Sequence, residues 1–379
     1  MNEPHQPNRL NRELEGRVVV SLEQAVAAPY CSLLLADAGA RVIKVERPEG
    51  DFARGYDRGA GGHSVFFAWL NRGKESIRID LENPGDLALL KTMLQSADVF
   101  LHNLAPGALA RRGLGGDDVR VRCPQLINCQ ISGYGADAAG RKAYDFLVQA
   151  EAGLCAVTGT AEQPSRVGVS LCDLATGLTA FSGILRALLQ RRDGGGGIDL
   201  SVSLFDVIGD WMNMPLLSHR YLGGAPSRLG LTHALIAPYG AYQTADRKQV
   251  LIAVQSNREW RALCEGVLQN PALGRDPRFA DNPKRVENRA AMDRAIDAVF
   301  GRKTRAGLMA SLERARIACA PLSSVQDLSH HACLRNLDIR FGGATVSVAD
   351  LPLQSDAERH REVPQLDQHG AALRREFKP

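Results

Sequence analysis

Residues 17–50 read RVVVSLEQAVAAPYCSLLLADAGARVIKVERPEG, and the architecture of the chain follows from them. The apolar run Val18 to Leu22 is typical of a buried strand. A helical pattern then opens at Pro29 and ends before Gly39, two residue types that commonly mark the start and the end of a helix. A second run rich in β-branched residues follows at Arg41 to Glu46. The stretch therefore predicts a strand, a helix and a second strand parallel to the first.

The same alternation continues along the chain on the carboxyl side of this stretch. Strands are expected near Ser76 to Leu81, at Asp98 to His102, at Gln125 to Ile131 and at Ile198 to Val202, with helices from Asn83-Pro84 onward and from about Leu174 to Gln190. This repetition predicts an α/β fold with a mostly parallel sheet and helices on both faces. Such sheets bind ligands beyond the carboxyl ends of their strands, which makes Arg47, Asn103 and the loop Ser132-Gly-Tyr-Gly135 candidates.

A change of composition beyond residue 225 indicates a second, smaller domain. A strand pair is expected within 237–256, followed by charged helices near 257–269, 286–300 and 304–316. We therefore predict a large Rossmann-like domain over 15–210, a small α+β domain over 225–325, and a C-terminal segment, 326–379, that returns to the large domain.

Composition excludes several classes of function. The 379 residues carry a net charge of only +4, which is too mild for a nucleic-acid-binding protein. The eight cysteines form no Cys-x-x-Cys pair, so neither a metal site nor thiol redox chemistry is expected. We find no secretory signal and no run approaching the roughly 20 apolar residues of a membrane span. We expect a cytoplasmic protein.

The common nucleotide and hydrolase motifs are also missing. The first strand is not followed by Gly-x-Gly-x-x-Gly, and the chain contains no phosphate-binding P-loop, His-Glu-x-x-His or Gly-x-Ser-x-Gly. Nicotinamide enzymes, ATPases, zinc hydrolases and esterases are therefore disfavoured. The turn Asn71-Arg-Gly-Lys74 is either a plain hairpin connection or a basic clasp for phosphates.

Asp173 stands where a loop gives way to the long helix. It is either an N-cap or a nucleophile that the positive helix terminus keeps ionised, and the two interpretations are compatible. Asp145 also resembles an N-cap. His233 lies alone in an apolar segment, where a histidine is more often a hydrogen-bonded core residue than a catalyst.

Eight short motifs occur together in order. They are Ala27-Ala-Pro29, Gly39-Ala-Arg-Val-Ile-Lys-Val-Glu-Arg47, Asn71-Arg-Gly-Lys74, Asp98-Val-Phe-Leu-His-Asn103, Pro106-Gly-Ala-Leu109, Ser132-Gly-Tyr-Gly135, Tyr144-Asp145 and Cys172-Asp173. In this combination the chain resembles the class III CoA-transferases, the family of formyl-CoA and carnitine CoA-transferases. The resemblance runs from about residue 15 to beyond residue 330.

The resemblance implies an interlocked homodimer whose large domain is built from both ends of each chain. It implies that Asp173 is the catalytic nucleophile, and that CoA or acyl-CoA binds as a substrate, with no permanently bound cofactor and no metal. The positions that it assigns to CoA binding are Val26, Ala27, Arg47, Arg72, Lys74, Asn103, Leu104, Arg111, Lys142 and Tyr144.

Within that family the chain looks most like the branch that handles C4 to C5 dicarboxylates such as itaconate, mesaconate and citramalate, often with succinyl-CoA as the donor. The second carboxylate of such an acid needs a cationic or donor-rich pocket, for which Arg72, Arg228 and His233 are candidates. Val26 stands where the family can carry glutamine, and the glycine-rich lid of formyl-CoA transferase has no counterpart, so oxalate and formate are not expected as substrates.

Two other functions stay open. An α-methylacyl-CoA racemase would share the fold, but its Gly-His-Asp pattern is replaced here by Ala143-Tyr144-Asp145. A tyrosine of ordinary pKa, near 10, is a poor base for abstracting an α-proton at neutral pH. The other alternative is a CoA-binding protein without catalysis.

Overall fold

The computed structural model describes residues 10, 12–135, 141–353 and 360–378, so that most of the polar N-terminal arm lies outside the described residues. The chain divides into two compact units. The first consists of Met1–Leu154, Arg166–Met214 and Arg335–Pro379, and the second of Cys155–Ser165 and Pro215–Leu334.

A six-stranded parallel sheet forms the centre of the first unit. Its strands are β1 (Val18–Leu22), β2 (Arg41–Glu46), β3 (Lys74–Arg78), β4 (Val99–His102), β5 (Ile127–Ser132) and β6 (Asp199–Ser203). They lie in the order β3-β2-β1-β4-β5-β6, with every pair parallel. The direction of the connections reverses between β1 and β4, and open sheets of this kind bind their ligands at that point. The expected parallel α/β sheet is confirmed.

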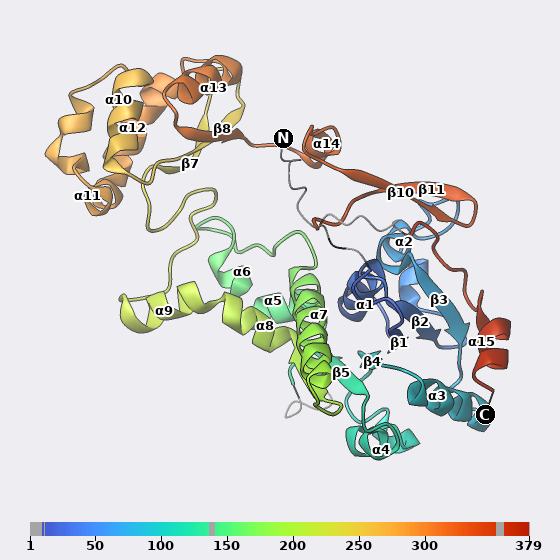
Figure 1. Cartoon of the computed structure of the whole chain (residues 1–379). Helices are drawn as coiled ribbons and strands as arrows, with labels where there is room; N and C mark the ends of the chain where they lie inside the picture. Colours follow the sequence, from blue (N-terminus) through green and yellow to red (C-terminus); the bar gives the residue numbers. More distant parts are fainter. Residues whose placement is uncertain (1–9, 11, 136–140, 354–359, 379) are drawn as a thin grey trace, which may run out of the picture. The chain divides into compact units, whose positions relative to one another are not determined.

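Helices cover both faces of this sheet (Figure 1). On one face lie α1 (Ala27–Asp37), α5 (Asp145–Glu151), α7 (Leu171–Arg192) and α8 (Leu204–Trp211); on the other lie α3 (Pro84–Gln95), α4 (Gly116–Arg122) and α15 (Gly370–Glu376). Alternate residues of one strand serve the two faces: Val19 packs under α1 and α7, whereas Val20 packs under α3. Both faces are apolar, which is why the strands read as continuous hydrophobic runs.

The C-terminal segment closes the far edge of the sheet. β10 (Asn336–Phe341) and β11 (Ala344–Ala349) form an antiparallel pair that packs on α2 (Val65–Asn71). Farther along, the N–H of Ser76 in β3 donates to Nδ1 of His369, just before α15. Residues from both ends of the chain therefore build one core.

The second unit has its own antiparallel sheet and core. Its sheet consists of β7 (Tyr239–Gln243), β8 (Gln249–Ala253) and β9 (Ala318–Pro321), covered by α10 (Asn257–Gly266), α11 (Asn282–Glu287), α12 (Arg289–Phe300) and α13 (Arg305–Arg314). Trp260, Phe279 and Phe300 are buried at its centre. The part of the chain that the structure describes also contains α6 (Leu154–Val157), α9 (Asn213–Tyr221), α14 (Val325–Ser329) and the short 3₁₀ helices η1 (Phe52–Gly55), η2 (Ala110–Arg112), η4 (Leu273–Arg275) and η5 (Pro277–Phe279).

Three expectations about local structure are wrong in detail. The strand expected at 76–81 begins at Lys74, because that lysine points into the core rather than into a turn. The single helix expected at 286–300 is two helices, and at the break the side chain of Asn288 donates to the carbonyls of Arg278 and Lys284. Among the described residues α7 is long and apolar enough to cross a membrane, although the sequence was expected to contain no such run.

Candidate active site

The site is built where the sheet order reverses. Asn103, just after β4, holds the loop that follows β1: its Oδ1 accepts from the N–H of Gln24 at 3.0 Å, and its Nδ2 donates to the carbonyl of Gln24 at 2.8 Å. Both hydrogen-bonding groups of its amide are thereby directed at one residue. Asn103 is a clamp between the two loops on either side of the reversal.

Asp173 lies in the first turn of α7, but it is not the N-cap. The N-cap is Ser170, whose side chain makes no capping hydrogen bond. Asp145 takes this role from another helix: its Oδ1 accepts from the N–H of Cys172 at 2.7 Å and from the N–H of Asp173 at 3.4 Å. The N-cap interpretation of Asp173 is therefore wrong, and its carboxyl group accepts no hydrogen bond from any described residue.

Gln149 completes this arrangement and was not identified from the sequence. One turn after Asp145 in α5, its Nε2 donates to Oδ2 of Asp145 at 2.7 Å, and its Oε1 accepts from the N–H of Val167 at 2.9 Å. Gln149 is fully buried. The loop before α7 is thus held against α5 by two side chains spaced four residues apart, a helical spacing that could have signalled the pair.

The surroundings of Asp173 disfavour its charged form. Burial in the first place, and the neighbouring charge of Asp145 in the second, raise the pKa of Asp173 to about 7. This overturns the expectation that the helix terminus keeps the group ionised, because Asp145 already occupies the free N–H groups of that terminus. A carboxylate of raised pKa is a more basic and stronger nucleophile than an ordinary aspartate.

The charge of this carboxyl group reaches Tyr56. Burial first, and then the charges of Asp51, Asp173 and Tyr144, raise the pKa of Tyr56 to about 12. Tyr144, the N-cap of α5, is 63% exposed. Tyr56 lies just beyond η1 in the glycine-rich loop 48–62 and was missed, since a tyrosine in such a loop has no distinguishing pattern.

The start of α1 lies beside Asp173 through a close helix contact. A Cβ on Gly177 of α7 would stand 2.5 Å from the carbonyl oxygen of Ala27 and 3.2 Å from Cβ of Tyr30. Gly177 is one turn beyond Asp173 on the same face of the helix. Ala27, which was assigned to CoA binding together with its neighbour Val26, therefore meets α7 one turn beyond Asp173.

Two other predicted residues line one cavity at the carboxyl ends of β1 and β2. The cavity measures about 190 Å³ and is lined by Arg47, Leu104 and Gln24 among others. Nε of Arg47 donates to the carbonyl of Gly50 at 2.8 Å, and its guanidinium lies 5.8 Å from the ring centre of Phe52. The guanidinium is half exposed, and a cation beside an apolar wall suits the phosphates and base of a nucleotide.

Lys74 and Arg72 point inward. The ammonium of Lys74 is fully buried and donates to Oε1 of Glu23 at 2.8 Å, to the carbonyl of Pro29 at 3.0 Å and to Oδ1 of Asn71 at 3.0 Å. Arg72 is 3% exposed and donates to the carbonyl of Trp69 at 3.3 Å. The turn is neither a hairpin nor an open phosphate clasp. It joins a helix to a parallel strand, and it buries both cations.

The other predicted residues have less specific surroundings. Arg111 in η2 and Lys142 before α5 are exposed in the first unit. Arg228 and His233 belong to the second unit and hold its loops. The guanidinium of Arg228 donates to the carbonyls of Ala156, Thr160 and Ala161. The ring of His233 stacks on Tyr239, and its Nδ1 accepts from the N–H of Leu235.

Known proteins resemble this chain in sequence and in structure. The family described as CoA-transferase family III matches residues 14–370. The acetyl-CoA:oxalate CoA-transferase of Acetobacter aceti is 33% identical over 98% of this chain and 97% of its own. The succinyl-CoA–D-citramalate CoA-transferase of Chloroflexus aurantiacus is 34% identical over 76% of this chain and 72% of its own. A CAIB/BAIF family protein from Brucella suis has a similar solved structure, with a TM-score of 0.83 and 31% identity over 97% of this chain and 100% of that one.

Proposed function

The chain belongs to CoA-transferase family III and is a CoA-transferase, and from that premise we propose that it carries CoA from succinyl-CoA to itaconate or a related C4 to C5 dicarboxylate through a covalent intermediate on Asp173. The observation that supports Asp173 is its isolated, half-buried carboxyl group, whose pKa is raised to about 7. The raised pKa makes this carboxylate more nucleophilic than an exposed aspartate, while a large fraction of it stays ionised near neutral pH.

The proposed reaction is a sequence of acyl transfers without a net gain or loss of protons. A carboxylate oxygen of Asp173 attacks the thioester carbonyl of the donor, the C–S bond breaks, and a mixed anhydride and a CoA thiolate result. The thiolate then attacks the carbonyl carbon of Asp173, which releases the donor as a free carboxylate and leaves an aspartyl-CoA thioester. The acceptor carboxylate repeats the two steps in reverse and regenerates Asp173. One thioester is exchanged for another, so that the reaction has no need of ATP.

Residues around Asp173 serve this chemistry by position. Asp145 and Gln149 hold the first turn of α7 and the loop before it, so that the carboxyl group stays in one orientation. The start of α1 packs against the same helix one turn from Asp173, and exclusion of water from this region would protect an anhydride from hydrolysis. Holding the reacting groups in place supplies much of the rate in reactions of this kind.

The preference for a dicarboxylate rests on the relatives and on one buried cation. The acids named for both relatives, oxalate and citramalate, carry two carboxyl groups. Of the three candidate groups for the second carboxylate, Arg72 belongs to the same unit as Asp173. Burial raises the pKa of Tyr30, which packs against Gly177, and the nearby charge of Arg72 offsets part of that rise. We assign the distal carboxylate to Arg72. The A. aceti relative makes oxalate a necessary member of any substrate panel, although it was not expected from the sequence.

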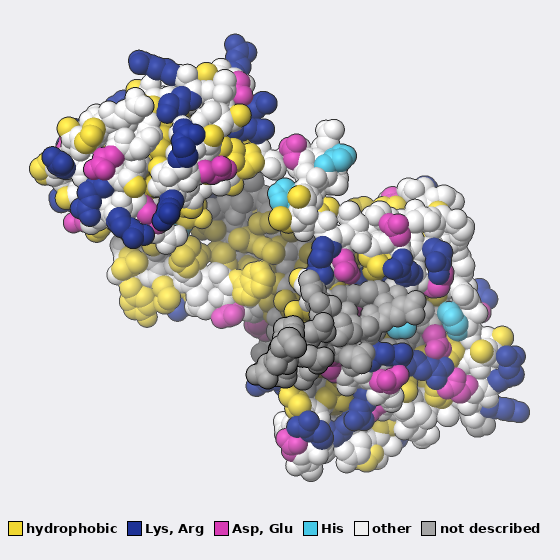
Figure 2. Space-filling view, turned by 45° about the horizontal axis from the view of Figure 1, so that its top comes forward, with side chains coloured by type: hydrophobic (Ala, Val, Ile, Leu, Met, Phe, Trp, Pro, Cys, Tyr) yellow, Lys and Arg dark blue, Asp and Glu magenta, His cyan; other side chains and the backbone are white. Residues whose placement is uncertain are grey.

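We further propose that a second copy of the chain covers part of the first unit, in the interlocked homodimer expected from the sequence. Only 39% of the apolar stretch of α7 is buried. Large hydrophobic side chains are exposed on α5, α7, α8 and the start of α9: Phe146, Leu147, Leu178, Leu189, Trp211 and Met214. Figure 2 shows hydrophobic side chains, in yellow, gathered on the surface of the molecule. An apolar surface of this extent is typical of an interface.

Two measurements test these assembly proposals. Light scattering on the purified protein is expected to give twice the mass of the 41.0 kDa chain. Cell fractionation is expected to place the protein in the cytoplasm. A monomer that sediments with membranes would show that α7 is covered by lipid instead.

The proposed reaction is tested by incubating the protein with succinyl-CoA and a panel of carboxylic acids, with oxalate and itaconate among them. New acyl-CoA species identify the acceptor, and kcat/KM ranks the acids. Exchange of the α-proton of an acyl-CoA without an acceptor would indicate a racemase. Tight CoA binding with neither activity would indicate a binding protein.

The intermediate has its own test. Hydroxylamine or borohydride during turnover is expected to modify Asp173 alone. Asp173→Ala is expected to abolish transfer while CoA binding persists. Transfer at the normal rate by that variant would disprove the covalent mechanism.

A further inference from the structure

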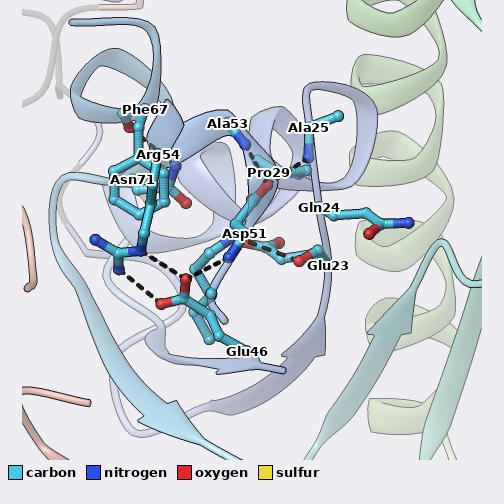
Figure 3. A network of polar contacts seen from close by, with 12 residues as sticks. Glu23, Gln24, Ala25, Pro29, Glu46, Asp51, Ala53, Arg54, Phe67 and Asn71 are labelled. Carbon is cyan, nitrogen blue, oxygen red and sulfur yellow. Dashed lines mark hydrogen bonds and ion pairs between the residues drawn. The ribbon is translucent and has the colours of Figure 1, made fainter. Parts of the chain in front are cut away.

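Four fully buried charged side chains lie together beneath the loops that surround Asp173. Nζ of Lys44 lies 2.9 Å from Oδ2 of Asp51 and 3.3 Å from Oε1 of Glu23, and Nζ of Lys74 lies 2.8 Å from the same Oε1. All four side chains are 0% exposed. Figure 3 shows Glu23 and Asp51 within the polar network in which they take part. We call Glu23, Lys44, Asp51 and Lys74 the buried ionic cluster.

Stability alone does not explain such a cluster. Taking four charges out of water has a desolvation cost that their mutual attraction offsets only when the geometry is good, and apolar side chains of the same volume often stabilise a fold equally well. Here the cluster is satisfied: Oε2 of Glu23 also accepts from the hydroxyls of Ser21 at 2.6 Å and Ser32 at 2.5 Å. Its specific contribution lies in the backbone groups that it holds.

Those backbone groups belong to the loop after β1 and to the first turn of α1. Oδ1 of Asp51 accepts from the N–H of Ala25 at 3.2 Å, and Nζ of Lys74 donates to the carbonyl of Pro29 at 3.0 Å. Ala25 has a φ of +64°, in the left-handed region that an alanine rarely adopts. Strain of this kind persists only where the surroundings enforce it, and it gathers at functional sites.

The cluster reaches Asp173 by two routes. Along α1, the turn that Lys74 holds is the one whose Ala27 carbonyl touches Gly177, one turn from Asp173. Along η1, the side chain of Asp51 accepts from the N–H of Ala53 at 2.9 Å and so caps the short helix that leads to Tyr56. Tyr56 in turn lies within the field of the Asp173 charge. One cluster therefore holds both the turn of α1 that packs on α7 one turn from Asp173 and the short helix that leads to Tyr56.

We propose that the buried ionic cluster positions the loop 24–29 and the η1 segment around Asp173, so that Lys74 and Glu23 are positioning residues of CoA transfer and Lys74 is not a ligand of CoA. The proposal rests on the transfer reaction proposed above. It departs from the sequence-based assignment of Lys74 to CoA binding, because an ammonium that is fully buried and donates three hydrogen bonds has no position left for a phosphate.

The test compares Glu23→Gln and Lys74→Gln, which keep the approximate shape and remove one charge each, with the double variant. Both single variants are expected to lower kcat by about 10²-fold, the loss associated with misplacing reacting groups by an ångström, and to leave the KM for succinyl-CoA unchanged. The double variant removes the Glu23–Lys74 pair and leaves Lys44 with Asp51, so it is expected to recover part of the lost kcat. Asp98→Asn is the control, because it removes a partly buried acid at the opposite end of the strands. There Asp98 pairs with Arg17 and Arg191. The kcat of this variant is expected to stay normal.

A second readout does not depend on activity. Backbone hydrogen exchange of residues 24–29 and 52–56 is expected to speed up in the Glu23→Gln and Lys74→Gln variants but not in Asp98→Asn. If a single-charge variant does not fold, Ser32→Ala removes only one hydrogen bond to Glu23 and gives a milder change in the same residues.

The outcomes separate this proposal from the proposed function. A higher KM for succinyl-CoA with normal kcat in Lys74→Gln would make Lys74 a CoA ligand and overturn the proposal, and so would unchanged exchange in both segments. Wild-type protein without transfer activity would refute the proposed function, whereas the exchange measurement would still decide whether the cluster holds the two segments.

Discussion

Replacing Asp173 by asparagine is expected to abolish transfer and to stabilise the protein in a pH-dependent way. The substitution keeps the shape of the side chain and removes its charge. The pKa of Asp173 is about 7 in the folded chain against an ordinary 3.8. Between these values the folded protein holds a proton that the unfolded chain has lost, so the contribution of Asp173 to stability falls as the pH rises through this window.

The size of the effect follows from the pKa. Each pH unit within the window changes the free energy of unfolding by about 1.4 kcal/mol. Between pH 5 and pH 8 the wild type therefore loses about 3 kcal/mol that Asp173→Asn retains, because asparagine does not titrate. The variant is expected to be the more stable protein at pH 8, and the difference is expected to shrink at pH 5.

Urea unfolding of both proteins at the two pH values measures this difference, and acyl-CoA formation measures the lost activity. Asp193→Asn, at the other end of α7, is the matched control, because it makes the same substitution at a side chain that is 69% exposed. A gap between wild type and Asp173→Asn that is the same at pH 5 and pH 8 would refute the idea that burial and Asp145 penalise the charge of Asp173.

Three more predictions concern Asp173 and residues around it. The value of kcat/KM is expected to rise with pH through about 7, because Asp173 ionises there. It is expected to fall above about pH 8, because burial lowers the pKa of Lys74 and this lysine then releases its proton. A flat profile from pH 6 to 9 contradicts both assignments. Gly177→Ala is expected to destabilise the protein by about 1–3 kcal/mol, because the new Cβ would clash with backbone, and to lower kcat. Gly183→Ala in the same helix is the control, because its Cβ would stand 3.5 Å from Leu200, and neither effect is expected. Equal unfolding midpoints of the two variants would count against the close contact at Gly177. Arg72→Gln is expected to raise the KM of dicarboxylate acceptors more than that of monocarboxylates, and equal effects on the two classes would remove Arg72 from the acid site.

Sequence patterns predicted the sheet well because its signals are local. The strands β1 and β2 and the helix between them appear as runs of apolar residues with end signals a few positions away, and the same holds for the long helix α7. The boundary of β3 was wrong because the inward direction of Lys74 depends on Glu23, a residue 51 positions earlier in the chain. The break at Asn288 was missed because both flanking segments have helical patterns.

The candidate site was only partly predictable for the same reason. Asp173 was found by its place at the start of a helix and by a resemblance, but its neighbours Asp145, Gln149 and Tyr56 were either misinterpreted or missed. Asp145 meets Cys172 across 27 positions of sequence, and Gln149 meets Val167 across 18. No pattern of adjacent residues carries such a contact.

The chain's amino-acid order by itself determined the parallel α/β architecture and the family, and it led to Asp173 as the proposed nucleophile, since periodicity and short motifs are properties of neighbouring residues. Tertiary structure alone decided which charges meet: Asp145 rather than Asp173 caps α7, Lys74 turns inward to Glu23, and the pKa of Asp173 rises toward neutrality. The physical reason is that desolvation and charge pairing depend on distance in space, which folding sets between residues far apart in the chain.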